Sequence, residues 1–104
     1  MLKISLLILF LYLLATTTAL AHTPYMACYD NGDKTISCFA EFSDGSSAEA
    51  TPIKVVDSTN TIIVSGKMDE LGEFTFNRPT SPYHVIFDAG PGHRVIEKST
   101  NIIE

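Results

Sequence analysis

The chain has few basic residues: seven lysines and arginines stand against twelve aspartates and glutamates among 104 residues, and no basic cluster occurs. Nucleic-acid binding depends on lysine and arginine side chains that displace counterions from phosphates. An acidic chain without such a cluster lacks this driving force, so we expect no nucleic-acid partner. Cations, or a basic patch on another protein, fit its charge better.

Sequence signatures of catalysis are also missing. The chain contains no HExxH zinc motif, no GxSxG nucleophile elbow and no glycine-rich phosphate loop. The acidic loop residues lack the spacing of an EF-hand, so we interpret them as turn formers and solubilising charges rather than calcium ligands. We therefore predict that the protein is not an enzyme.

Long apolar runs are absent except at the N-terminus. There, Lys3 precedes an almost wholly apolar stretch over 4–15, and the small residues Ala19 and Ala21 follow. This pattern is typical of a secretory signal peptide, here 1–21, with cleavage after Ala21. The run falls short of the roughly 20 residues that a membrane-spanning helix needs, although an uncleaved anchor is the alternative. We expect a periplasmic or secreted protein with no membrane span in its mature chain.

Cleavage would remove 21 of the 104 residues and leave an 83-residue domain that begins at His22. Because Lys3 departs with the signal peptide, six basic residues remain against twelve acidic ones, a formal charge near −6. A domain of about 80 residues buries only some 60 to 65% of its unfolded surface. Such a domain is marginally stable without an additional cross-link.

Cysteine is scarce as well, and Cys28 and Cys38 are the whole complement. In an oxidising compartment an even number of cysteines predicts a disulfide, and closing a loop of about ten residues stabilises a fold by roughly 2 to 3 kcal/mol. A metal thiolate pair would need a CxxC spacing or further cysteines. The disulfide also constrains the hairpin at 31–33: a two-residue turn puts the cysteines three positions out of register, whereas a loop of three or five residues aligns them.

Alternating apolar and polar residues fill the rest of the chain, with turn residues recurring about every eight to twelve positions. This pattern predicts short strands, and no window shows the period of a helix. We expect an all-β fold, a small antiparallel β-sandwich of about seven strands, as one domain over 22–104. The predicted strands are Pro24–Asp30, Thr35–Phe42, Pro52–Val56, Thr61–Ser65, Glu73–Asn77, Tyr83–Asp88 and Arg94–Lys98.

The aromatic residues of the later strands form the predicted core. Phe74 and Phe76 point to one side of their strand, and Tyr83 and Phe87 point to one side of theirs. His84 alternates with the second set, so we interpret it as a surface or second-sheet residue rather than a metal ligand.

His22 is the sharpest candidate for chemistry. Cleavage would give it a free α-amino group, and this amine and the imidazole together can close a chelate ring on one metal ion. Such a two-nitrogen clamp suits Cu or Ni. His93 is the second candidate, because the glycines of its loop permit sharp turns and the position of the loop between two strands would aim the imidazole off the end of the sandwich. Two alternatives stay open: an accidental histidine at a frayed terminus, and a solvated His93 hydrogen-bonded to Asp88.

Three motifs resemble a known module, the carboxypeptidase regulatory-like β-sandwich, which is transthyretin-like. Together with a mature terminus at His22 and the loop sequence Asp88-Ala89-Gly90-Pro91-Gly92-His93, they make the mature chain similar to the small periplasmic accessory subunits of bacterial nickel and cobalt energy-coupling-factor transporters. The three motifs are Phe42-Ser43-Asp44-Gly45-Ser46, Gly66-Lys67-Met68-Asp69-Glu70 and Gly72-Glu73-Phe74-Thr75-Phe76.

The resemblance implies a non-enzymatic accessory protein that binds Ni or Co, with Cu as the alternative, and presents it to membrane components of a metal transporter. It implies that His22 and His93 belong to one metal-handling end, with Asp88 orienting the ligands or completing the site. A different class of function is a periplasmic structural or interaction module without metal, which would dock through exposed edge strands. An oxidative polysaccharide-cleaving enzyme would share His22, but 83 residues offer too little surface for its flat substrate face.

Overall fold

The computed structural model describes residues 23–104, and in this range the chain is an all-β sandwich. The predicted signal peptide, its cleavage residues Ala19 and Ala21, and His22 lie outside the described residues. Within 23–104 no helix has the length and apolar character that crossing a membrane requires. The elements are β1 (Pro24–Asp30), β2 (Thr35–Phe42), β3 (Pro52–Asp57), β4 (Ile62–Lys67), β5 (Glu73–Asn77), β6 (Tyr83–Asp88), β7 (Arg94–Lys98) and the 3₁₀ turn η1 (Ser99–Asn101).

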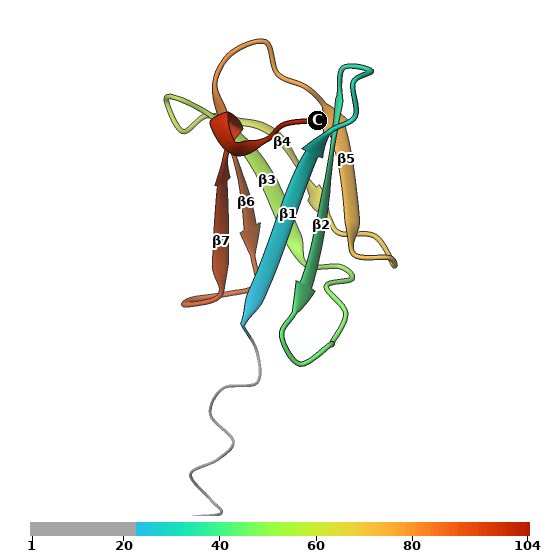
Figure 1. Cartoon of the computed structure of the whole chain (residues 1–104). Helices are drawn as coiled ribbons and strands as arrows, with labels where there is room; N and C mark the ends of the chain where they lie inside the picture. Colours follow the sequence, from blue (N-terminus) through green and yellow to red (C-terminus); the bar gives the residue numbers. More distant parts are fainter. Residues whose placement is uncertain (1–22) are drawn as a thin grey trace, which may run out of the picture.

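Two antiparallel sheets face each other across the core (Figure 1). One sheet has three strands in the order β1-β2-β5, and the other has four in the order β4-β3-β6-β7. The edge strands β1 and β7 pack together across the sheets, as do β4 and β5. Both lateral edges of the sandwich therefore bring the two sheets into contact.

The bounds of five strands agree with those predicted, and β3 and β4 differ by one or two residues at their ends. At its far end β4 extends to Lys67 because Lys67 pairs with Pro52 of β3. The other differences arise at the turn between the two strands. The Asp57 N–H donates to the Thr61 carbonyl at 2.9 Å, and the Asp57 carboxylate accepts from the N–H groups of Thr59 and Thr61 at 2.9 and 3.0 Å. Because Thr61 takes part in this turn, β4 begins only at Ile62, and β3 extends to Asp57.

The hairpin between β1 and β2 has the register that the predicted disulfide requires. Cys28 lies directly opposite Cys38, and the two form a disulfide with Cα atoms 4.0 Å apart. The Asn31 N–H donates to the Thr35 carbonyl at 3.0 Å, which closes a loop of three residues in which Gly32 has a φ of 77°. The disulfide and the three-residue loop are thereby confirmed, and the two-residue turn is excluded.

The core lies between the sheets and is built from alternate positions of the strands. Phe76 and Tyr83 come from different sheets, and their rings meet edge to face with centroids 6.0 Å apart. Phe74 is only half-buried, at the margin of the core. The largest fully buried side chains are Phe87, Ile36, Ile53, Val55, Val85 and Cys38.

Candidate functional site

Thr23, the first described residue, and the loop that carries His93 lie at the same end of the sandwich. In Figure 1 this end, the lower one, carries the start of β1, the end of β2 and the loop between β6 and β7. The strands that lead to this end also pack together, since β1 contacts β7 across the two sheets. The topology therefore brings Thr23, the residue after His22, to the same end as the loop 89–93.

Thr23 is held in place by the loop that follows β2. Its N–H donates to the Ser43 hydroxyl at 3.1 Å, and the Ser43 N–H donates to the Thr23 carbonyl at 2.9 Å. The neighbouring Asp44 carboxylate shapes this loop by accepting from the Ser46 N–H at 2.9 Å and from its hydroxyl at 2.6 Å. The Phe-Ser-Asp-Gly segment is thus a backbone anchor for the start of the described chain.

His93 closes the loop between β6 and β7. The Ala89 N–H donates to the His93 carbonyl at 3.0 Å, and the His93 N–H donates to the Gly90 carbonyl at 2.9 Å. The exposed imidazole has its Nδ1 3.1 Å from the Pro91 carbonyl. Because a carbonyl only accepts, this contact places the ring proton on Nδ1 and leaves the lone pair of Nε2 for a metal ion.

Asp88 supports the loop from the end of β6. Its Oδ1 accepts from the Gly90 N–H at 3.0 Å and lies 3.1 Å from Nε of Arg94. The Gly90 hydrogen bond first, and the Arg94 contact second, hold the pKa of Asp88 below its usual range, so this carboxylate is charged at neutral pH. The hydrogen bond from His93 considered above is not formed, because the imidazole contacts Pro91 instead. A role for Asp88 as a metal ligand stays a prediction.

The residues 23–104 do not by themselves assemble a metal centre. In this range no group of three or more histidine, cysteine, aspartate or glutamate side chains could hold a metal ion. His93 and Asp88 lie at the two ends of one loop, whereas His22 is outside the described residues. The shared site of His22 and His93 therefore stays a prediction, to which the described chain contributes Nε2 of His93.

His84 lies elsewhere, on the outer face of the four-stranded sheet. It opposes Val56 and Lys98, and it is four residues from Asp88, about 13 Å along an extended strand. Burial of Tyr83 and Val85 on either side of it confirms the predicted alternation. Its Nδ1 is buried and has no hydrogen-bond partner among the described residues. His84 does not join the end of the sandwich that carries His93.

The acidic loop residues serve their own turns, as the sequence predicted. The Asp69 carboxylate accepts from the N–H groups of Leu71 and Glu73, both at 2.9 Å, and Asp57 bonds its turn in the same way. Hydrogen bonds lower the pKa of Asp57, and the bond from the Thr59 hydroxyl has the largest effect. These carboxylates stabilise loops rather than face a common cation.

Positive charge is concentrated on one surface that the sequence did not predict, which we call the basic face. It is the outer face of the four-stranded sheet and carries four of the six basic residues that follow the predicted signal peptide. Each occupies a polar position in the alternation of its strand, which was visible in the sequence, but the strand order that brings them together was not. The four residues are Lys54, Lys67, Arg94 and Lys98.

Comparisons of the chain with protein-family models, curated proteins and solved structures find no match. The likeness to accessory subunits of nickel and cobalt transporters thus rests on the motifs of the sequence, and it stays a prediction.

Proposed function

We propose that the protein is an exported, non-enzymatic accessory protein that binds a transition-metal ion, Ni or Co with Cu as the alternative, through His22 and His93. The observation that carries the proposal is the placement of Thr23 and the loop 89–93 at the same end of the sandwich. Thr23 is anchored there by two hydrogen bonds to Ser43.

The donor set suits this chemistry. An amine and an imidazole on His22 close a chelate ring, and Nε2 of His93 adds a third nitrogen, a set that Ni, Co and Cu accept. The Pro91 carbonyl fixes the tautomer of His93 in the way that outer-shell hydrogen bonds orient metal-bound imidazoles. Since the amine must be deprotonated and the rings neutral to bind, the metal affinity falls as the pH drops below about 8, the ordinary pKa of an α-amino group.

The disulfide supports an oxidising location. Cys28 and Cys38 are both buried and bonded to each other, and the described chain has no free cysteine. Disulfides of this kind form and persist in the periplasm or outside the cell, and they are rare in the cytosol. We therefore place the protein in the periplasm or among secreted proteins, where its partners are the metal ion and membrane components of a metal transporter.

Native mass spectrometry on protein exported and processed by its own signal tests the proposal. We expect a mass that begins at His22 and one Ni²⁺, Co²⁺ or Cu²⁺ per chain. His22→Ala, and an extra alanine before His22 that keeps the imidazole but displaces the amine, each abolish tight binding. His93→Ala weakens binding at least about tenfold, while the control His84→Ala keeps the full affinity. Unchanged metal affinity in both His22 variants would contradict the proposal.

A second candidate is an interaction module without metal, favoured by one surface of the three-stranded sheet. Its outer face exposes Tyr25 by 62%, Tyr29 by 52% and Phe39 by 44%, and aromatic residues of these types are enriched where proteins meet. This candidate replaces the first if the processed protein retains no metal beyond the level of a generic histidine peptide.

A further inference from the structure

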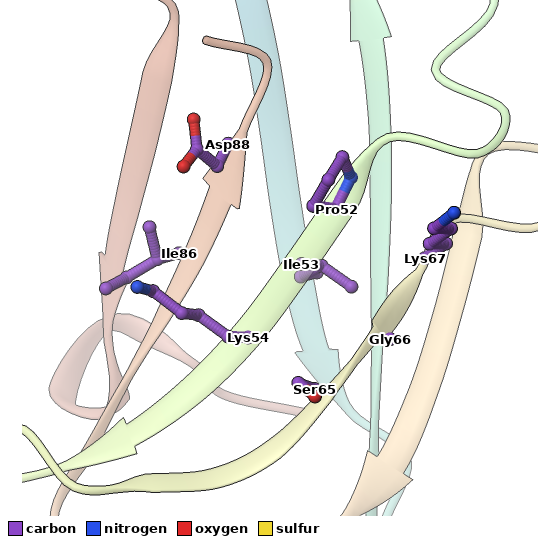
Figure 2. A pocket seen from close by; sticks show the side chains of 8 residues that line it. All are labelled: Pro52, Ile53, Lys54, Ser65, Gly66, Lys67, Ile86 and Asp88. Carbon is purple, nitrogen blue, oxygen red and sulfur yellow. The ribbon is translucent and has the colours of Figure 1, made fainter. Parts of the chain in front are cut away.

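A groove of about 440 Å³ lies on the basic face, over β3, β4 and β6 (Figure 2). Pro52 and Ile86 give it apolar surface, Ser65 contributes a hydroxyl, and Asp88 stands at one end. In Figure 2 the Lys54 side chain extends from β3 toward Ile86, and Lys67 lies on the β4 side of β3. Strands β1 and β2 run behind this sheet, so the groove opens away from the core.

The charges around the groove are positive on balance. Lys54 and Lys67 form no ion pair with another described residue, whereas Asp88 is 3.1 Å from Arg94. Three positive groups therefore stand against one carboxylate, in a chain whose formal charge is −5. The two basic residues beyond this face are elsewhere engaged or distant: Arg78 pairs with Asp30 at 2.8 Å, and Lys34 belongs to the β1–β2 loop. The groove is thus the local exception to an acidic surface.

Apolar surface continues from the groove toward the edge of the sheet. In the strand registers Lys54 opposes Ile86, and Ile86 opposes Ile96, which is 56% exposed. Neighbouring strands lie about 4.8 Å apart, so this strip extends roughly 10 Å from the backbone of Lys54 to that of Ile96. A cationic end and an apolar strip thus lie in one line across three strands.

We propose that this groove binds a small organic carboxylate with an apolar body. The carboxylate would accept a charge-assisted hydrogen bond from Lys54, and Lys67 would add its positive charge from the β4 side of the groove. The apolar part would cover Ile86 and extend toward Ile96. The groove has the size of ligand pockets, which typically enclose about 300 to 1,000 Å³, and it combines apolar surface with few polar groups as they do. The inference goes beyond the metal proposal and does not depend on it: His93 does not line the groove, and Asp88 is the one described residue that the groove shares with the proposed metal site.

The test is a ¹H–¹⁵N NMR titration of the exported, metal-free protein with octanoate, beside 1-octanol as an uncharged probe of the same length. We expect saturable shifts of the backbone amides of Ser65, Lys67 and Ile86 with octanoate alone. Lys54→Gln and Lys67→Gln each weaken octanoate binding about two- to fivefold, the range of exposed ion pairs. The matched control is Lys98→Gln, which removes a charge from the same face outside the groove and leaves the affinity unchanged.

Three results would overturn the proposal. If millimolar octanoate causes no saturable shifts of the backbone amides, the groove does not bind carboxylates. If 1-octanol causes equal shifts, the carboxylate does not contribute to binding. Tighter binding of the peptide Glu-Leu-Glu than of octanoate, with the same lysine dependence, assigns the groove to an acidic protein segment instead. Because all these titrations use metal-free protein, they stand or fall separately from the metal measurements.

Discussion

Gly72 lies where the loop between β4 and β5 approaches β2. Its carbonyl accepts from the Ala40 N–H at 2.9 Å, its φ is 72°, and a Cβ at this position would lie 2.6 Å from the Ala40 carbonyl oxygen. Gly45 has a similar φ of 81°, but a Cβ there would meet nothing within 4 Å. A residue with a Cβ would therefore be strained by the left-handed backbone at either position. Only at position 72 would its Cβ also collide with a neighbouring atom.

This difference predicts unequal effects of alanine. Gly45→Ala lowers the free energy of unfolding by about 1 kcal/mol, the cost of a left-handed residue with a Cβ. Gly72→Ala lowers it by roughly 2 to 4 kcal/mol, because backbone must also shift to relieve the contact with Ala40. Urea denaturation of both variants measures the two values. Equal losses would show that the approach to Ala40 imposes no constraint.

The turn carboxylate of Asp57 predicts a dependence of stability on pH. Hydrogen bonds from Thr59 first, and from Thr61, lower its pKa in the folded chain below the ordinary 3.8. Asp57 therefore stabilises the fold fully above that ordinary value, and the contribution is lost as the pH falls through the lower, folded one. We expect Asp57→Asn to flatten the fall of the urea midpoint on the acid side of about pH 4.

Glu70→Gln is the control for that measurement. Glu70 is exposed in the β4–β5 loop and makes no hydrogen bond to another described residue, so its neutralisation leaves the slope on the acid side unchanged. If Asp57→Asn and Glu70→Gln have the same acid profile, the turn hydrogen bonds of Asp57 do not contribute to the pH dependence.

At the scale of elements, alternation predicted the strands but not their partners. Alternation of apolar and polar residues with a period of two predicts each strand and the face that it buries. The Cys28–Cys38 pair additionally predicted the register of β1 against β2. Nothing local specifies that β5 joins β2, or that β3 lies between β4 and β6. These are contacts between distant segments, chosen by the packing of the whole core.

For the candidate site, too, the sequence predicted where residues lie along the chain but not which groups they contact. Glycines and strand ends placed His93 in a loop at the end of the sandwich, but the Pro91 contact of its imidazole depends on the fold of the loop. Asp88 looked free to bind metal in the sequence, whereas Gly90 and Arg94 engage its carboxylate. The basic face was hidden for the reason given above, because its residues lie on three strands whose order the sequence does not encode locally.

The β1–β2 hairpin carries the prediction that belongs to this scale. Replacing both Cys28 and Cys38 with alanine lowers the free energy of unfolding by about 2 to 3 kcal/mol, since the reduced unfolded chain regains the freedom of a loop of ten residues. Urea denaturation with and without reductant measures the loss. Reductant lowers the midpoint of the unmutated protein and leaves that of the variant unchanged; a reductant-insensitive wild type would contradict a stabilising disulfide.

Considered as a whole molecule, the protein has two unlike outer faces. The four-stranded sheet presents the basic face, while the three-stranded sheet presents Tyr25, Tyr29 and Phe39. Phe39 opposes Ala27 between the two tyrosines, and its ring lies 6.3 Å from that of Tyr29. Net negative charge keeps copies of the chain apart at neutral pH, and this repulsion weakens as the pH falls toward the isoelectric point, which is about 5.0 for the whole chain and lower once Lys3 is removed with the predicted signal peptide.

The aromatic face therefore predicts self-association that depends on pH. Static light scattering of the exported protein should give a second virial coefficient that falls between pH 8 and about pH 5. Phe39→Ser raises this coefficient near pH 5 more than Leu71→Ser does, although Leu71 is 81% exposed and Phe39 only 44%. The reason is that Phe39 lies between two tyrosines and its ring contacts that of Tyr29, whereas no strand pairing or ring contact among the described residues joins Leu71 to this patch. An equal or larger effect of Leu71→Ser would mean that total exposed apolar area, rather than a continuous face, governs the association.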